Sequence, residues 1–286
     1  MSEWPLMVFT LALQLAAGLA LFLTIVDLRA HELSVSTLRP IGLAVFPIAA
    51  LGLAVSILHL GRPLLAFLSL ANPGDSPLSR EILACLLFLP AAFVYSLMWW
   101  VRKRRGRTAA GALVSALGLV AVAASSLVYM VPSLPAWNAG WLPVSFLASA
   151  AILGGLVPLA VTGGSPDRRT LRLLLSLVLS GSGGLFIAAV WLVSILVRGS
   201  TDSFASGLMA QASQLLLGRY APLYGLHLLL AVVLPAAFAF RLWPLGKGGG
   251  PAWSRVVSLA VGSAGLVGVA IGRALAYALL SSQLPF

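Results

Sequence analysis

Long apolar segments separated by short polar stretches dominate the hydrophobic pattern of this chain. A helix needs about 20 mostly apolar residues to cross the roughly 30 Å hydrocarbon layer of a membrane. None of the apolar segments shows the alternating pattern of a transmembrane strand. The pattern therefore predicts an all-α integral membrane protein, a bundle of eight transmembrane helices in a single membrane domain of residues 1–286. The expected spans lie near 5–26, 41–59, 82–101, 109–131, 141–162, 171–196, 222–241 and 254–279.

The composition supports this class and excludes others. Of the 286 residues, 60% are hydrophobic and 9% are charged, and the mean hydropathy is +1.03. A water-soluble enzyme is excluded, because a soluble chain of this composition would expose large apolar patches and aggregate. Cys85 is the single cysteine. One cysteine is too few for a disulfide framework, and too few for an iron–sulfur cluster in this chain, since such a cluster needs about four thiolates.

Lysine and arginine predict which ends of the spans face the cytoplasm, because positively charged loops are retained there. Thirteen lie in the loops after the first, third, fifth and seventh spans, and four lie in the other loops. Both termini are therefore expected outside. The basic run at 102–107 is interpreted as a topology determinant and a contact for phospholipid headgroups. This placement argues against a nucleic-acid partner despite the net charge of +11.

The two longest connections, about 60–81 and 197–221, are both expected outside. Neither is long enough to fold into a cofactor-binding domain alone. The second mixes leucine, methionine and phenylalanine with polar residues, which predicts a short amphipathic helix on the outer surface. Such a helix is either a surface on which a partner docks or a connector that lies on the lipid surface.

The seven carboxylates divide into two groups. Six fall in predicted termini or loops, where solvation explains them: Glu3, Asp27, Glu32, Asp75, Asp167 and Asp202. Glu81 stands where an outer loop enters the third span. It is either a helix-start residue, with Ser79 as the cap and the carboxylate favoured by the helix dipole, or a functional group. His59 ends the second span on the same side and is either a satisfied interfacial residue or a ligand.

Three further polar residues lie within spans. Arg273 is expected about one to two turns below the outer surface, where a charge is costly and usually functional or paired; the alternative is snorkelling to the headgroups. His227 is a weaker candidate for a functional residue. Gln14 is expected to form an interhelical hydrogen bond. Haem on His59 and His227 is disfavoured, because their expected depths differ by roughly 10 Å. No metal site is predicted.

Five motifs follow one another along the chain. They are Glu3-Trp4-Pro5-Leu6-Met7-Val8-Phe9-Thr10, His59-Leu60-Gly61-Arg62-Pro63, Leu78-Ser79-Arg80-Glu81-Ile82, the stretch from Tyr129 to Asn138, and Gly272-Arg273 with Tyr277. Glu81 follows His59 by 22 residues. In order and spacing these motifs resemble the membrane anchor subunit of dimethyl sulfoxide reductase, the DmsC family. The resemblance extends essentially from end to end of the sequence.

The resemblance implies a haem-free anchor without molybdenum or iron–sulfur clusters of its own. Such an anchor holds a molybdopterin catalytic subunit and a four-cluster iron–sulfur subunit to the periplasmic face of the bacterial inner membrane. It serves anaerobic respiration by oxidising menaquinol and passing electrons to the nearest cluster. In that family, the histidine of the His-Leu-Gly motif and the glutamate after the second loop are associated with quinol oxidation. They match His59 and Glu81.

On this interpretation Glu81 accepts a proton, because partial burial disfavours its charged form, and His59 hydrogen-bonds the quinol oxygen. Arg273 polarises that oxygen or holds Glu81, and Tyr277 completes the quinol pocket. Apolar side chains of the second, third and last spans are expected to receive the isoprenoid tail. The alternatives are an anchor that reduces quinone, an anchor without a quinol site, and a small-molecule transporter. Transporters typically carry midplane ionisable residues on broken helices, and these are almost absent here.

Overall fold

Helices make up all regular secondary structure in the parts of the protein that the computed structural model describes, which are residues 4–29, 35–58, 68–162, 167–199, 203–244 and 255–283. They are α1 (Trp4–Leu28), α2 (Val35–Ile57), α3 (Pro77–Trp100), α4 (Arg107–Val128), α5 (Trp141–Thr162), α6 (Arg168–Arg198), α7 (Ser203–Ser213), η2 (Gln214–Arg219), α8 (Ala221–Leu228), η3 (Leu229–Val233), α9 (Leu234–Leu242) and α10 (Arg255–Gln283). Within these residues, eight helical runs are long and apolar enough to cross a membrane: α1 to α6, the run from α8 through α9, and α10. The predicted all-α architecture with eight spans is confirmed for the described residues.

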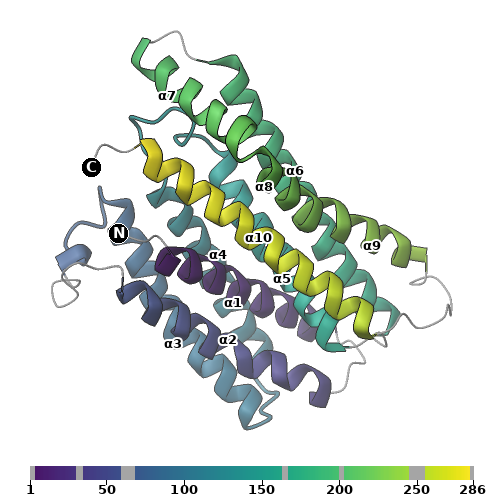
Figure 1. Ribbon diagram of the computed structural model, residues 1–286. Helices are drawn as coiled ribbons and strands as arrows, with labels where there is room; N and C mark the ends of the chain where they lie inside the picture. Colours follow the sequence, from purple (N-terminus) through teal and green to yellow (C-terminus); the bar gives the residue numbers. More distant parts are fainter. Residues whose placement is uncertain are drawn as a thin grey trace.

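The centre of the bundle is formed by α1 and α5, which pack against each other and against most other helices. Their backbones approach closely at Gly18 and Gly154. A Cβ atom on Gly18 would lie 2.1 Å from the carbonyl oxygen of Ala150 and 2.9 Å from the amide nitrogen of Gly154. Small residues allow this approach, and van der Waals packing then holds the helices together in lipid. Figure 1 shows α2 and α3 on one side of this centre, α6, α8 and α9 on the other, and α10 lying along it.

The bundle has two ends, and the site described below lies at one of them. Figure 1 shows that α1 begins and α10 ends at the same end. We call this the outer end, after the orientation predicted from charge, and the opposite end the inner end. Since the spans alternate in direction, α3 begins and α4 ends at the outer end.

The segment after α6 is helical almost without interruption from Ser203 to Leu242, through α7, η2, α8, η3 and α9. The sequence predicts a short helix here, and the structure has one in α7. Its placement differs from the prediction of a helix lying across the outer surface. In Figure 1, α7 continues in the direction of α8, and it packs beside α6.

The inner end holds a buried ion pair between α1 and α4. Arg107 donates from Nε and Nη2 to the two carboxylate oxygens of Asp27, at 2.8 and 2.7 Å. The Arg107 guanidinium also lies over the Trp99 ring, 3.8 Å from its centroid. The side chains of Arg107 and Asp27 are 7% and 10% exposed. The expectation that Asp27 is a solvated loop residue is therefore wrong, because α1 extends past it and α4 supplies a bidentate partner.

Candidate functional site

The register of three helices brings polar residues together at the outer end. Gly118 of α4 lies against α1 and α3: a Cβ atom there would meet Phe88 Cε2 at 2.9 Å and Ala17 Cβ at 3.0 Å. Both α1 and α3 run antiparallel to α4. Residues that lie equally far from the Gly118 contact, in the direction of the outer end, are therefore at the same depth in all three helices. About two turns further along, the same three helices carry Thr10, Glu81 and Ser125.

Glu81 is a buried residue of α3 and not a helix-start residue. The N-cap of α3 is Ser76, whose side chain accepts a hydrogen bond from the Ser79 amide at 3.3 Å. The Ser79 hydroxyl instead donates to the Ser69 carbonyl oxygen. Glu81 therefore lies beyond the first turn, where it is 6% exposed. The helix-start interpretation, with Ser79 as the cap, is wrong because the helix begins earlier than the sequence suggests.

Two tyrosines lie in the neighbourhood of Glu81. Tyr277 of α10 donates from its hydroxyl to the Tyr129 hydroxyl at 2.8 Å, and the two rings meet edge to face with centroids 5.2 Å apart. Glu81 is close enough to interact electrostatically with both tyrosines, and the Ser125 side chain lies beside its carboxyl group. Tyr129 follows the end of α4 directly, so this pair links α4 to α10 next to Glu81.

Arg273 is buried one turn below Tyr277 on α10. Its guanidinium carbon lies 3.6 Å from the centroid of the Phe146 ring, and the residue is 6% exposed. No carboxylate of the described residues pairs with it, and its Nε has no hydrogen-bond partner there. The snorkelling alternative is therefore wrong, because the guanidinium is held inside the bundle by a cation–π contact.

Several buried polar atoms of this cluster lack a partner among the described residues. They belong to Gln14, Glu81, Ser125 and Arg273. Gln14 lies one turn from Thr10 on α1, and neither atom of its amide is hydrogen-bonded within the part of the protein described. The interhelical hydrogen bond expected for Gln14 is therefore not formed there. Because buried polar groups are normally paired with protein or ordered water, these atoms are available to a polar ligand.

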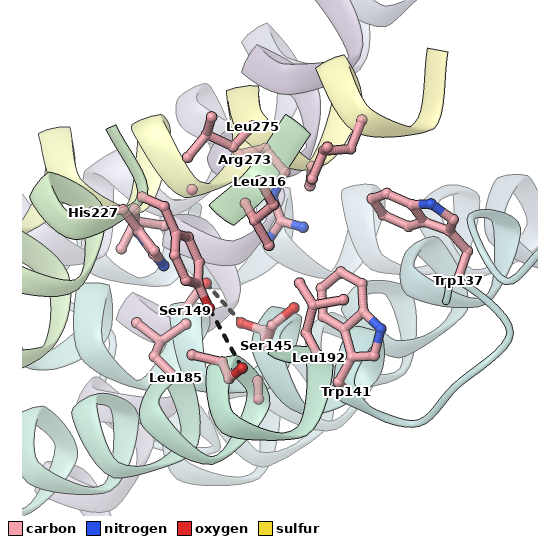
Figure 2. A pocket seen from close by; sticks show the side chains of 17 residues that line it. Trp137, Trp141, Ser145, Ser149, Leu185, Leu192, Leu216, His227, Arg273 and Leu275 are labelled. Carbon is pink, nitrogen blue, oxygen red and sulfur yellow. Dashed lines mark hydrogen bonds between the residues drawn. The ribbon is translucent and has the colours of Figure 1, made fainter. Parts of the chain in front are cut away.

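A second feature, next to this cluster, is a cavity of about 60 Å³ between α5, α6, α8 and α10. Figure 2 shows His227 and Arg273 beside it, with Trp137, Trp141 and Ser145 around the same space. His227 Nδ1 donates to the Gly268 carbonyl oxygen at 2.7 Å, which leaves Nε2 as the acceptor of a neutral ring. The ring also packs on Gly272, where a Cβ atom would lie 2.4 Å from His227 Cε1.

Of the predicted site residues, the structure brings Glu81, Tyr277 and Arg273 together. His59 lies outside the described residues. Tyr129 has no role in the expectations drawn from sequence, although it follows Ser125 by one helical turn, a spacing that places both on one face. The described residues contain no group of three or more histidine, cysteine or carboxylate side chains that could hold a metal ion.

The fold and the site define a class: a multi-pass helical membrane protein with a buried polar cluster at one end of the bundle. Within that class the protein belongs to the DmsC family, described as the DMSO reductase anchor subunit, which matches residues 1–279. An anaerobic dimethyl sulfoxide reductase subunit of Escherichia coli (strain K12) is similar, with 34% identity over 192 residues, covering 63% of this chain and 66% of the relative.

Two further relatives are similar at comparable levels. The YnfH subunit of anaerobic dimethyl sulfoxide reductase from Escherichia coli (strain K12) is 30% identical over 167 residues, covering 56% of this chain and 57% of the relative. An anaerobic dimethyl sulfoxide reductase subunit of Haemophilus influenzae (strain ATCC 51907 / DSM 11121 / KW20 / Rd) is 32% identical over 161 residues, covering 54% and 56%. The matches therefore span between 56% and 66% of the relatives' own lengths.

Proposed function

We propose that this protein anchors a respiratory molybdenum and iron–sulfur oxidoreductase to the membrane and oxidises menaquinol at the outer end of its bundle. The observation that carries the proposal is the group of unpartnered polar atoms around Glu81, within a member of the DmsC family. A quinol headgroup supplies hydroxyl groups that pair with such atoms. Its oxidation releases two protons and two electrons, so the site also needs a proton acceptor and an outlet for electrons.

Glu81 is the proposed proton acceptor. Oxidation breaks each O–H bond of the quinol; Glu81 takes one proton, and His59 hydrogen-bonds the ring oxygen and relays the second. The electrons leave to an iron–sulfur cluster of the partner subunit. A carboxyl group that is 6% exposed has a large desolvation cost when charged, which suits a group that binds and releases a proton during turnover.

Arg273 and Tyr277 position the reacting groups in this proposal. The Tyr277 hydroxyl donates to Tyr129 and so fixes both phenols beside Glu81. The Arg273 guanidinium stabilises negative charge that develops on the quinol oxygen, since no carboxylate of the described residues neutralises it. The same residues serve quinone reduction if electrons flow in the opposite direction.

The proposal also fixes the location of the partners. With thirteen basic residues in the loops assigned to the inner end and four in the others, we place the outer end in the periplasm of a bacterial inner membrane. The iron–sulfur subunit, with four clusters, and the molybdopterin catalytic subunit then dock on the periplasmic side. A single membrane domain of residues 1–286 carries the quinol site, and molybdenum and iron remain in the partners.

Replacing Glu81 tests this function. In native membranes, Glu81→Gln removes the proton acceptor while keeping the size of the side chain. We expect menaquinol-dependent reduction of dimethyl sulfoxide to fall about 100-fold or more, the usual contribution of a general base. Reduction driven by an artificial dye, which bypasses the anchor, and the amount of assembled complex should stay unchanged.

The matched control is Asp75→Asn, which makes the same kind of change at an exposed carboxylate of the outer loop. It should leave both activities as in the wild type. If Glu81→Gln retains menaquinol-dependent turnover, Glu81 is not the proton acceptor.

A further inference from the structure

An apolar groove lies between the outer ends of α1 and α10. It has a volume of about 270 Å³ and is lined by Trp4, Met7, Ala274, Tyr277, Ala278 and Ser281. The four α10 residues recur at spacings of three and four, so they form one face of that helix. Ala274 and Trp4 are exposed, which opens the groove to the outside of the bundle.

The groove offers a ligand hydrocarbon contact and almost no hydrogen bonds. The Ser281 hydroxyl donates to the Ala278 carbonyl oxygen of its own helix at 3.1 Å. The Tyr277 hydroxyl donates to the Tyr129 hydroxyl at 2.8 Å and lies 3.4 Å from the Leu6 carbonyl oxygen. The remaining lining is alanine, methionine and tryptophan, and the small side chains of Ala274 and Ala278 leave room beside α10. Such a lining suits a flexible hydrocarbon tail.

Tyr277 connects the groove with the polar cluster. Its ring lines the groove and also a small cavity of about 10 Å³ shared with Tyr129, Phe146 and Arg273. Its hydroxyl bonds to Tyr129 beside Glu81. One side chain therefore separates a groove open to the membrane from the groups that would bind a quinol headgroup.

We propose that this groove holds the isoprenoid tail of the quinol, so that the headgroup reaches Glu81 sideways from the membrane, past Tyr277. A quinol dissolved in lipid must approach a carboxyl group that is 6% exposed, and the groove ends at the side chain next to that group. This inference rests on the proposed function. The sequence led us to expect the tail against the second, third and last spans. The groove instead places the tail between the first and last spans.

Blocking the groove tests this assignment. Ala274→Trp fills the groove with an indole, whereas Ala260→Trp places the same side chain at an exposed position nearer the inner end of α10. Both variants are compared in native membranes with menaquinol, which carries a tail, and with menadiol, which has none. We expect Ala274→Trp to raise the KM for menaquinol at least tenfold, leaving kcat and the KM for menadiol unchanged. Ala260→Trp should change neither.

Two results overturn the tail assignment. One is an Ala274→Trp variant with wild-type KM for menaquinol, as expected if only the acyl tail of a lipid occupies the groove. The other is an equal rise in KM for both quinols. Dye-driven activity shows whether each variant assembles with its partners. If Ala274→Trp prevents assembly, Ala278→Leu blocks the groove with a smaller side chain. Retained turnover in Glu81→Gln refutes Glu81 as the proton acceptor, whereas an inactive Glu81→Gln beside a normal Ala274→Trp refutes only the tail site.

Discussion

Buried polar side chains gather at both ends of the bundle, and at each end some of their atoms lack a partner among the described residues. At the inner end, Arg107 and Asp27 form a bidentate pair. At the outer end, Gln14, Glu81 and Arg273 keep atoms without a partner among the described residues. An unpaired buried polar group costs about 1–3 kcal/mol, so the outer end is stabilised when a polar ligand enters. The two buried carboxylates differ: both oxygens of Asp27 are paired with Arg107, whereas Glu81 Oε1 has no partner among the described residues.

The inner pair predicts a stability effect at the residue scale. Arg107→Ala leaves the Asp27 carboxylate buried and unpaired, which should lower the free energy of unfolding by about 3–5 kcal/mol. Detergent-denaturation curves of the purified protein measure this change. The double variant Asp27→Ala with Arg107→Ala should lose less than Arg107→Ala alone, because no charge is then stranded.

Arg104→Ala is the control for that experiment, because Arg104 belongs to the same basic run and is exposed. It should shift the curve by less than about 1 kcal/mol. Equal losses for Arg104→Ala and Arg107→Ala would mean that the buried pair contributes no more than a surface charge.

At the scale of elements, hydropathy and length predict the spans well, whereas partners across helices depend on register. The apolar run of α1 is visible in the sequence, but the partner of Asp27 near its end is Arg107 of α4, 80 residues away. Glu81 is identifiable as a candidate because it is a carboxylate beside an apolar span. Tyr129 is not, because its role comes from the contact with Tyr277, 148 residues later. Local sequence patterns do not encode such separations.

The contact between α1 and α5 gives a prediction for helix packing. Gly18→Ala places a Cβ atom 2.1 Å from the Ala150 carbonyl oxygen, so the two helices must move apart. We expect a loss of about 1–3 kcal/mol in stability, measured by detergent denaturation. Gly183→Ala in α6 is the matched control, because nothing lies within 4 Å of its added Cβ atom. A Gly18→Ala variant as stable as Gly183→Ala would contradict this close contact.

At the scale of the whole molecule, function depends on which side of the membrane the polar cluster faces. Single cysteines report this in a Cys85→Ala background. Asp75→Cys at the outer end should react with a membrane-impermeant thiol reagent in intact cells, and Arg104→Cys at the inner end only after permeabilisation; both positions are exposed. Labelling of Arg104→Cys in intact cells would show that the orientation is the reverse of the proposed one and that the partners lie in the cytoplasm.

The most direct test of the central claim is purification of the protein from its native membrane in a gentle detergent, with molybdenum, iron and haem assayed in the same sample. We expect a stoichiometric complex with one molybdenum-containing and one iron–sulfur protein, and no haem. A protein that purifies alone from intact membranes, free of molybdenum and iron, would contradict the anchor function.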